Sequence, residues 1–329
     1  MSKAAALALA LFAALSVASC SKKQPAAEIP MMGRLETFSY DPAVRFEDRI
    51  GAMPEKLLEQ YRLMDGRPGY KSYMPTAEER ALVLEYLRLM PPVAERVFRE
   101  SCVGLYFLEG FQGNGMVSWV LDEKGKLYFH MTLNPASFRQ TLSETLTERE
   151  SSCFSPGAGW AVSVDAGRKY KGLAYALFHE AAHAVDQMRG VTPLVDPSQP
   201  EASRVPARPD GGLFTEVWDS HSRPFSRNEF WSRDSLTFYG FGGGPKIKVS
   251  DAYGVYKGFS GTPFASLYGS KSWAEDFAEL TAYGLITGKL GQPYRIRLSG
   301  PGPKDDVFEP MKGAAARRAA AALALLERM

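Results

Sequence analysis

Two histidines four residues apart, His179 and His183, constrain this chain more than any other feature of its sequence. With Glu180 between them they form the pattern H-E-x-x-H, inside the stretch LFHEAAHAVD. Residues four apart share one face of an α-helix, so both imidazoles can reach the same metal ion. A catalytic zinc usually has three protein ligands and leaves a fourth position open to water. The pattern therefore predicts a metal-binding helix and requires a third ligand from elsewhere in the chain.

Two acidic residues on a later stretch are the best candidates for completing the site. Glu275 and Glu279 lie four apart in AEDFAE, so they share a helix face. Two alternatives stay open. Ser272 stands three residues before Glu275, and Glu275 could only close the start of a helix in a capping box. His221 is a further possible ligand, whereas Arg189, six residues after His183, excludes the class of zinc peptidases that places a histidine or aspartate there.

The two motifs together resemble a known family. HEAAHAVD and FASLYGSKSWAEDFAE resemble the zincin-like domain of the anthrax lethal factor type, a gluzincin, and a set of bacterial zinc-binding metallopeptidase lipoproteins. The resemblance covers these blocks and the order of elements between residues 75 and 288. It implies that His179, His183 and Glu275 bind Zn²⁺ and that Glu279 orients a ligand histidine from behind. It also implies that Glu180 is the general base and that Tyr268, seven residues before Glu275, assists the transition state.

Other polar residues near these motifs have less specific roles. Asp186 lies near the end of the expected metal-binding helix, where its charge opposes the helix dipole. We therefore expect Asp186 to have a partner, either as a structural contact or behind the metal ligands. His130 alternates with Phe129 and Met131 on an expected strand, and we expect it to face the surface or a cleft wall rather than a metal.

The N-terminus reads as an export signal. Residues 1–19 have a short basic start and then an apolar run that is too short to span a bilayer comfortably. Val17 to Cys20 resembles a lipobox, which implies cleavage before Cys20 and lipid attachment to its thiol. An ordinary secretory signal is the alternative. The expected location is the bacterial cell envelope, and the outer membrane if the cell is Gram-negative.

Two further cysteines, Cys102 and Cys153, remain after the signal. An exported protein meets an oxidising compartment, so this pair predicts one disulfide, with two buried free thiols as the alternative.

The expected fold is α+β, with a small mixed sheet, the H-E-x-x-H helix and a later helix that carries the third ligand. We expect a tether and N-terminal segment over residues 20–74, the zincin-like domain over 75–300 and a tail with a helix over 301–329. Strands are expected at 102–110, 116–121, 127–133 and 159–165, with the second and third forming a hairpin, and helices around 75–99, 137–150, 170–189 and 272–288. Thr76 and Glu79 can form a capping box at the start of the first helical stretch, which Pro91 and Pro92 break into two helices. Gly190 is the expected end of the helix that carries H-E-x-x-H. Residues 191–270 read as long loops lining a site, and the strand at 127–133 as an edge along which a peptide can pair.

The charge balance excludes one class of partner. The chain has 39 basic and 37 acidic residues, a net charge of +2, and no basic block. Nucleic acid is therefore not an expected partner. Two functions stay open: an active zinc endopeptidase acting on peptides or proteins, or a lipoprotein that keeps the zincin fold but serves as a binding or assembly module.

Overall fold

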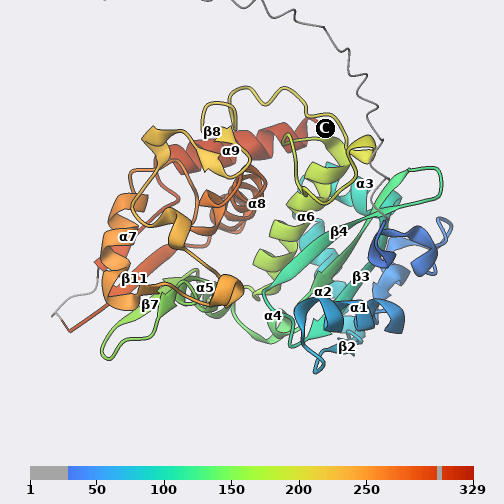
Figure 1. Ribbon diagram of the computed structural model, residues 1–329, viewed down its shortest axis with the longest axis horizontal. Helices are drawn as coiled ribbons and strands as arrows, with labels where there is room; N and C mark the ends of the chain where they lie inside the picture. Colours follow the sequence, from blue (N-terminus) through green and yellow to red (C-terminus); the bar gives the residue numbers. More distant parts are fainter. Residues whose placement is uncertain (1–28, 302–305) are drawn as a thin grey trace, which may run out of the picture.

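The computed structural model describes residues 29–301 and 306–329, and it mixes helices with small sheets as the sequence predicts (Figure 1). The expected signal peptide and Cys20 lie outside the described residues. Among the residues that are described, no helix combines the length and the apolar composition that crossing a bilayer requires.

The largest sheet is mixed and contains the hairpin expected from the sequence. Its strands run in the order β1-β3-β5-β4, and β2 also pairs with β3. β3 is parallel to β1 and β5, whereas β4 is antiparallel to β5. The bounds are β1 (Ile50–Gly51), β2 (Lys71–Tyr73), β3 (Cys102–Glu109), β4 (Gly115–Leu121) and β5 (Leu127–Leu133).

Both faces of this sheet are covered, which explains why every residue of β5 is buried. One face packs against α1 (Glu55–Asp65) through Leu57, Leu58 and Tyr61. The opposite face packs against α2 (Ala77–Leu87), α3 (Pro92–Ser101) and α6 (Leu173–Arg189). The expected break between α2 and α3 at Pro91 and Pro92 is present, as is the capping box of Thr76 and Glu79.

The domain begins well before residue 75, so the predicted boundary is wrong. β1 and β2 supply strands to the main sheet, and α1 covers one of its faces. These strands are only two and three residues long, too short to show a period in the sequence. Pairing with β3, rather than local propensity, makes them strands.

The half of the molecule that carries α7 and α8 in Figure 1 is built from later parts of the chain. After α4 (Ala136–Arg139) and α5 (Leu142–Ser151), short strands form three small sheets, of which the largest has the order β12-β11-β7. The remaining elements are β6 (Phe154–Ser155), β7 (Ala161–Asp165), β8 (Trp218–Ser220), β9 (Arg223–Pro224), β10 (Ile247–Lys248), α7 (Ala252–Phe259), α8 (Trp273–Gly284), β11 (Arg295–Ser299), β12 (Asp306–Phe308) and α9 (Ala314–Glu327). Residues 191–270, expected as loops, therefore contain one α-helix and several short strands and turns.

The C-terminal helix is part of the fold rather than a separate tail. α9 packs on α8 (Figure 1), and Ala319, Ala322 and Leu326 are buried in the same core as α6. Arg318 of α9 donates to the carboxylate of Asp276 of α8 from both terminal guanidinium nitrogens, at 2.6 and 3.0 Å.

The expected disulfide is not formed. Cys102 and Cys153 are both free and fully buried. Cys102 begins β3 beside Arg49, whereas Cys153 follows α5 near Glu150, so the two thiols have different neighbours. Burial raises the pKa of the Cys102 thiol to about 12, which keeps it protonated and unreactive.

Candidate metal centre

Helix α6 lies between the main sheet and α8, and it is buried over almost its whole length. Its many alanines allow this close approach from both sides. The helix ends where expected, at Gly190, whose left-handed backbone (φ 64°) closes the last turn onto the carbonyl of Asp186. His179, Glu180 and His183 are thereby placed at fixed positions between the two halves of the molecule.

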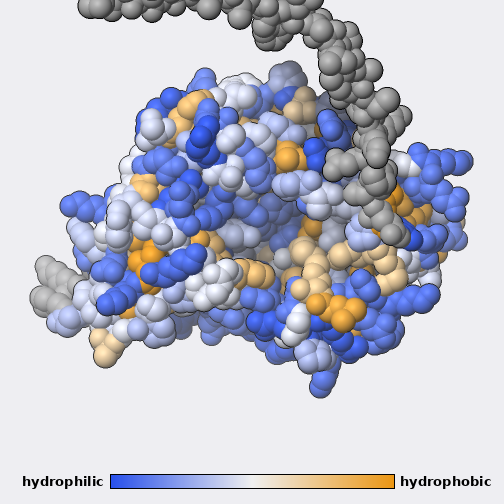
Figure 2. Space-filling view, viewed as in Figure 1, coloured by the Kyte–Doolittle hydropathy of each residue, from blue (hydrophilic) through white to orange (hydrophobic). Residues whose placement is uncertain are grey.

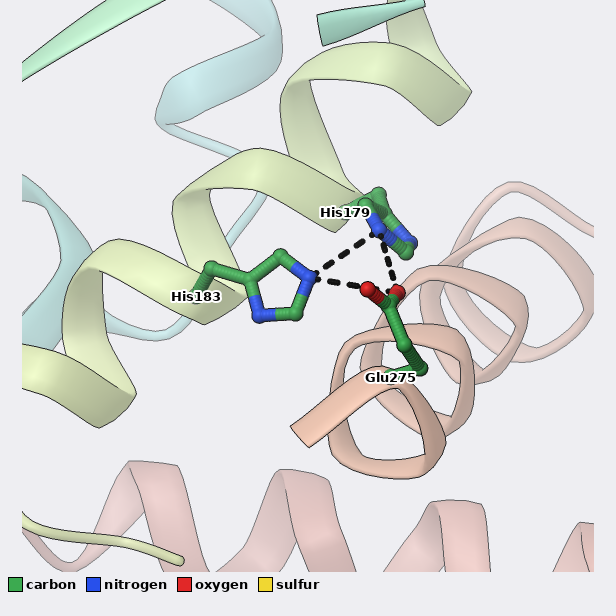
Figure 3. A group of neighbouring side chains, drawn as sticks. All are labelled: His179, His183 and Glu275. Atoms are coloured by element: carbon green, nitrogen blue, oxygen red, sulfur yellow. Dashed lines mark hydrogen bonds and ion pairs between the residues drawn. The ribbon is translucent and has the colours of Figure 1, made fainter. Parts of the chain in front are cut away.

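Three side chains from α6 and α8 point at a common centre (Figure 3). The Nε2 atoms of His179 and His183 are 3.1 Å apart. Oε2 of Glu275 lies 3.2 Å from Nε2 of His179 and 3.4 Å from Nε2 of His183. His179 and Glu275 are 96 residues apart in the sequence, so only the packing of α8 against α6 brings them together.

These separations are close to those that a tetrahedral zinc ion would require. Zinc binds imidazole nitrogen and carboxylate oxygen at about 2.0–2.2 Å, so two ligand atoms on one tetrahedron are about 3.3–3.6 Å apart, slightly more than the separations here. Oε2 of Glu275 is buried yet has no partner in hydrogen-bonding geometry. Its neighbours are the two imidazoles at ion-pair distance, so this oxygen and their nitrogens face one centre. Two neutral nitrogens and one carboxylate also form a donor set that suits catalytic zinc.

The capping alternative for Glu275 is excluded. Ser272 does cap α8, because its hydroxyl accepts from the backbone N–H of Glu275 at 3.2 Å. The side chain of Glu275 does not return to the backbone of Ser272, unlike the complete capping boxes of α2 and α5. Its carboxylate therefore turns toward the two histidines.

His221 does not join the three ligands. Its ring packs edge-on against Trp273, with centroids 5.5 Å apart, and the group of converging ligand atoms excludes it. Nε2 of His221 is buried without a hydrogen-bond partner among the described residues. Burial lowers the pKa of His221, so the ring stays neutral beside the site.

Glu279 holds His179 from behind, as the resemblance implies. Nδ1 of His179 donates to Oε1 of Glu279 at 2.8 Å, which aims Nε2 at the centre. The same carboxylate accepts from the hydroxyls of Tyr175 and Ser266 and from Nη1 of Arg149, the last at 2.6 Å. An imidazole held in this way keeps one ring orientation and gains basicity as a ligand.

Sequence reasoning missed Arg149, the residue that bonds the carboxylate of Glu279 from α5. It is fully buried on α5, where it also bonds Glu150 and the hydroxyls of Tyr175 and Tyr283. The sequence does contain a trace of it: Leu142 and Leu146 are buried on the same helix face, seven and three residues before Arg149. A charge inside such an apolar stripe indicates a buried partner, but it does not identify Glu279 as that partner.

The surrounding charges set the protonation of the centre. Burial opposes the charged form of His179, but Glu275 and Glu279 outweigh it and raise its pKa to about 10. Burial likewise opposes ionisation of Glu275, but the two histidines lower its pKa well below the usual range. A metal ion binding at neutral pH must therefore displace a proton from His179.

Glu180 faces a cleft of about 340 Å³ that also exposes the three candidate ligands. Figure 2 shows this face of the molecule hollowed between its two halves. Burial raises the pKa of Glu180, while the nearby histidines lower it. Gly115 allows this placement, since a Cβ at Gly115 would lie 2.5 Å from Cγ of Glu180.

The edge strand beside the cleft is β4, not the strand at 127–133 as expected. β5 lies inside the sheet between β3 and β4. β4 pairs with β5 on one side, and among the described residues its other side carries one bridge, from Leu121 to Arg34. Gly115, Met116 and Val117, at the other end of β4, line the cleft. A hairpin pattern in a sequence does not show which of its two strands is outermost. Here β3 pairs with β5, and β4 is therefore left at the edge of the sheet.

Tyr268, the tyrosine that the resemblance implies assists the transition state, lies beside the candidate ligands. Its ring is 5.6 Å from that of His179, and it lines the cleft together with Glu180 and Glu275. Burial raises the pKa of its hydroxyl well above the ordinary value, so the group stays protonated and able to donate.

Asp186 has a partner, as expected from its place near the end of α6, and this partner is Thr192. Its carboxylate accepts from the backbone N–H and the hydroxyl of Thr192, both at 2.6 Å. This contact ties the end of α6 to the segment that follows it. Nδ1 of His183 has no hydrogen-bond partner among the described residues, so Asp186 does not hold that ring.

Comparisons with protein-family models, with curated proteins and with solved structures find no match to this chain. The resemblance to zincin-like peptidases therefore stays a prediction from the two motifs.

Proposed function

We propose that this protein is a zinc-dependent metallopeptidase of zincin-like fold that hydrolyses peptide bonds. The observation that carries the proposal is the convergence of His179, His183 and Glu275 on one centre, with Glu180 beside them in an open cleft. The three distances between ligand atoms are close to those around zinc, and Oε2 of Glu275 faces the same centre as the two imidazole nitrogens. A decayed site would be expected to lose at least one of these four residues.

The roles of the side chains follow from their positions. A bound zinc ion would polarise the scissile carbonyl and acidify a water molecule. Glu180 is the one motif residue outside the ligand group, so its carboxylate can take the proton of that water and return it to the leaving amine. The Tyr268 hydroxyl donates to the carbonyl oxygen as negative charge develops on it. The substrate peptide extends along the end of β4 near Gly115, where β4 is the outermost strand of the main sheet.

We place this enzyme at the bacterial cell envelope, attached through a lipid on Cys20. The support is the lipobox-like end of the signal sequence at Val17 to Cys20. Incorporation of labelled palmitate into the wild type, and its loss in Cys20→Ala, would test the anchor. Absence of label in the wild type would leave an ordinary secretory signal.

The decisive experiment removes the base and leaves the ligands. Glu180→Gln keeps size and polarity but cannot accept a proton. Zinc content should stay at the wild-type level, while single-turnover cleavage of a library-selected peptide should fall by about 10²–10⁴-fold. Tyr268→Phe should cost on the order of 10²-fold, since it removes one oxyanion donor while zinc remains.

Two outcomes would contradict the proposal. Wild-type protein that binds zinc but cleaves nothing in a diverse peptide library would favour the binding or assembly module. A Glu180→Gln variant as active as the wild type would assign the cleavage to a contaminant or to another site.

A further inference from the structure

The glycine-rich segment FYGFGGGP (residues 238–245) forms one wall of the cleft, and it is firmly attached there. Tyr239 and Phe241 line the cleft, and the ring of Phe238 packs edge-on against Tyr268 with centroids 4.8 Å apart. The backbone N–H of Tyr239 donates to Oγ of Ser152 at 2.9 Å. Its carbonyl accepts from Nε2 of Gln112 at 2.8 Å. This wall is therefore held in place from α5 and from the turn that precedes β4.

Tyr239 has a backbone conformation that tyrosine rarely adopts. Its φ is 55°, in the left-handed region. Gly240 and Gly242 to Gly244 have positive φ as well, and glycine tolerates such angles at no steric cost. A large side chain in this region costs on the order of 1–3 kcal/mol, and such residues cluster at functional sites. In this conformation the Tyr239 side chain lines the cleft.

The hydroxyl of Tyr239 accepts one hydrogen bond, and it donates none to the described residues. Its oxygen accepts from Nδ2 of Asn114 at 2.8 Å. Among the described residues, no acceptor takes the proton of this hydroxyl. Asn114 directly precedes the first residue of β4, so the pair lies at the start of the edge strand, next to Gly115 and Glu180.

The direction of β4 determines which part of a peptide would meet this pair. Antiparallel pairing is the more stable arrangement of two strands. A peptide antiparallel to β4 passes its carboxyl-terminal side along Gly115 toward Asn114. Because Glu180 lies against Gly115, the residue after the scissile bond is the one that reaches Asn114 and Tyr239.

The charges of the cleft indicate what chemical group is bound there. Glu180, Asp196 and Glu275 are acidic, and none of the described residues that line the cleft is a lysine or arginine. A terminal carboxylate beside Asn114 would find no lysine or arginine among the described lining residues to pair with. A neutral main-chain carbonyl of a continuing chain fits a tyrosine hydroxyl that is free to donate.

Resting on the proposed peptidase function, we propose that Asn114 and Tyr239 form a subsite for the peptide on the carboxyl side of the scissile bond. The Tyr239 hydroxyl donates a hydrogen bond to a main-chain carbonyl there. The enzyme thus favours chains that continue past the cleaved bond, as an endopeptidase does, over chains that end one residue beyond it.

The test uses the full-length zinc-loaded protein and internally quenched decapeptides from a random library. One decapeptide that the wild type cleaves is shortened in steps from its carboxyl end, and separately from its amino end. Tyr239→Phe should raise KM by about 5–10-fold for peptides that extend two or more residues past the cleaved bond, with kcat changed less than twofold. For peptides that end one residue past it, wild type and variant should converge. Asn114→Ala should act in the same direction, and the double variant should add little.

Tyr253→Phe, an exposed tyrosine on α7, is the matched control, and zinc content with thermal midpoint reports on folding. Three results would overturn the subsite alone while leaving the peptidase intact. In the first, Tyr239→Phe has the same KM and kcat as the wild type for peptides of every length. In the second, its KM differs from that of the wild type only when peptides are shortened from the amino end. In the third, Tyr239→Phe lowers kcat by the same factor whatever the length of the peptide. A wild type that cleaves no library peptide would overturn the subsite and the proposed function together.

Discussion

His130 and His179 are both buried, but their neighbours shift their pKa values in opposite directions. His179 faces two carboxylates, which raise its pKa to about 10. His130 lies on β5 with Phe38 on one side and the hydroxyl of Tyr61 3.3 Å from its Nε2. No charge compensates its burial, which lowers its pKa to about 3. His130 was expected at the surface or on a cleft wall, and that expectation is wrong because α1 covers this face of the sheet.

A pH dependence of stability follows from His130. The unfolded chain takes up a proton on this histidine near pH 6.5, whereas the folded protein keeps it neutral down to about pH 3. Stability is therefore lost as the pH falls through this window. Between pH 6.5 and pH 5 the loss amounts to about 1.5 kcal/mol. His130→Gln should remove that contribution, so its free energy of unfolding in urea should fall less steeply over this range. Equal slopes for variant and wild type would show that His130 is protonated in the fold.

At the scale of elements, α8 supplies two acidic side chains to the site. Ser272 caps its first turn. Glu275 then contacts the candidate ligand histidines, and Glu279 accepts a hydrogen bond from Nδ1 of His179. Since Glu275 and Glu279 are one turn apart, a small rotation of α8 would disturb both contacts together. The Arg149 network resists such a rotation by bonding Glu279 from α5.

Variants of α8 can separate capping from metal binding. Glu275→Ala should reduce zinc occupancy as strongly as His179→Ala, because each removes one ligand. Glu279→Ala should lower zinc affinity by about 10–100-fold, which is less. Ser272→Ala removes the cap only, so it should cost about 1 kcal/mol of stability and leave zinc content unchanged. Zinc measured by metal analysis, together with urea unfolding, gives both readouts. Full zinc retention in Glu275→Ala would refute the ligand assignment and revive His221.

At the scale of the whole molecule, the C-terminal helix completes the core around α8. Asp276 is fully buried, and it accepts from two nitrogens of Arg318 and from Nε1 of Trp218 at 2.9 Å. One carboxylate thereby ties α9, α8 and the segment around β8 together. It stands next to Glu275 in the sequence, so the contact also supports the position of a candidate ligand.

Breaking this contact should destabilise the entire fold. Arg318→Ala leaves the carboxylate of Asp276 buried without its cation, which typically costs about 3–5 kcal/mol. Adding Asp276→Asn removes the uncompensated charge, so the double variant should recover part of that loss. Urea unfolding of the wild type, both single variants and the double variant measures the coupling. Additive losses in the double variant would mean that the two side chains stabilise the protein independently.

Local patterns in the sequence were enough to predict α6, its end at Gly190, the β4–β5 hairpin and the capping box of α2, since each depends on residues within one element. The same holds for the pairing of His179 with His183, which one helical turn brings together. Glu275 was predicted with the help of a family resemblance, because 96 residues separate it from His179.

Only the tertiary structure decided the rest. The position of β4 at the edge, the inclusion of β1 and β2, the burial of His130 and the separate environments of Cys102 and Cys153 all depend on contacts between distant segments. Arg149 behind Glu279 and Tyr239 beside Asn114 are of the same kind, at separations of 130 and 125 residues. Periodicity reports which side of an element is buried, but it holds no information about which partner lies there. That choice comes from the packing of the complete core, where each buried polar group must find its partner.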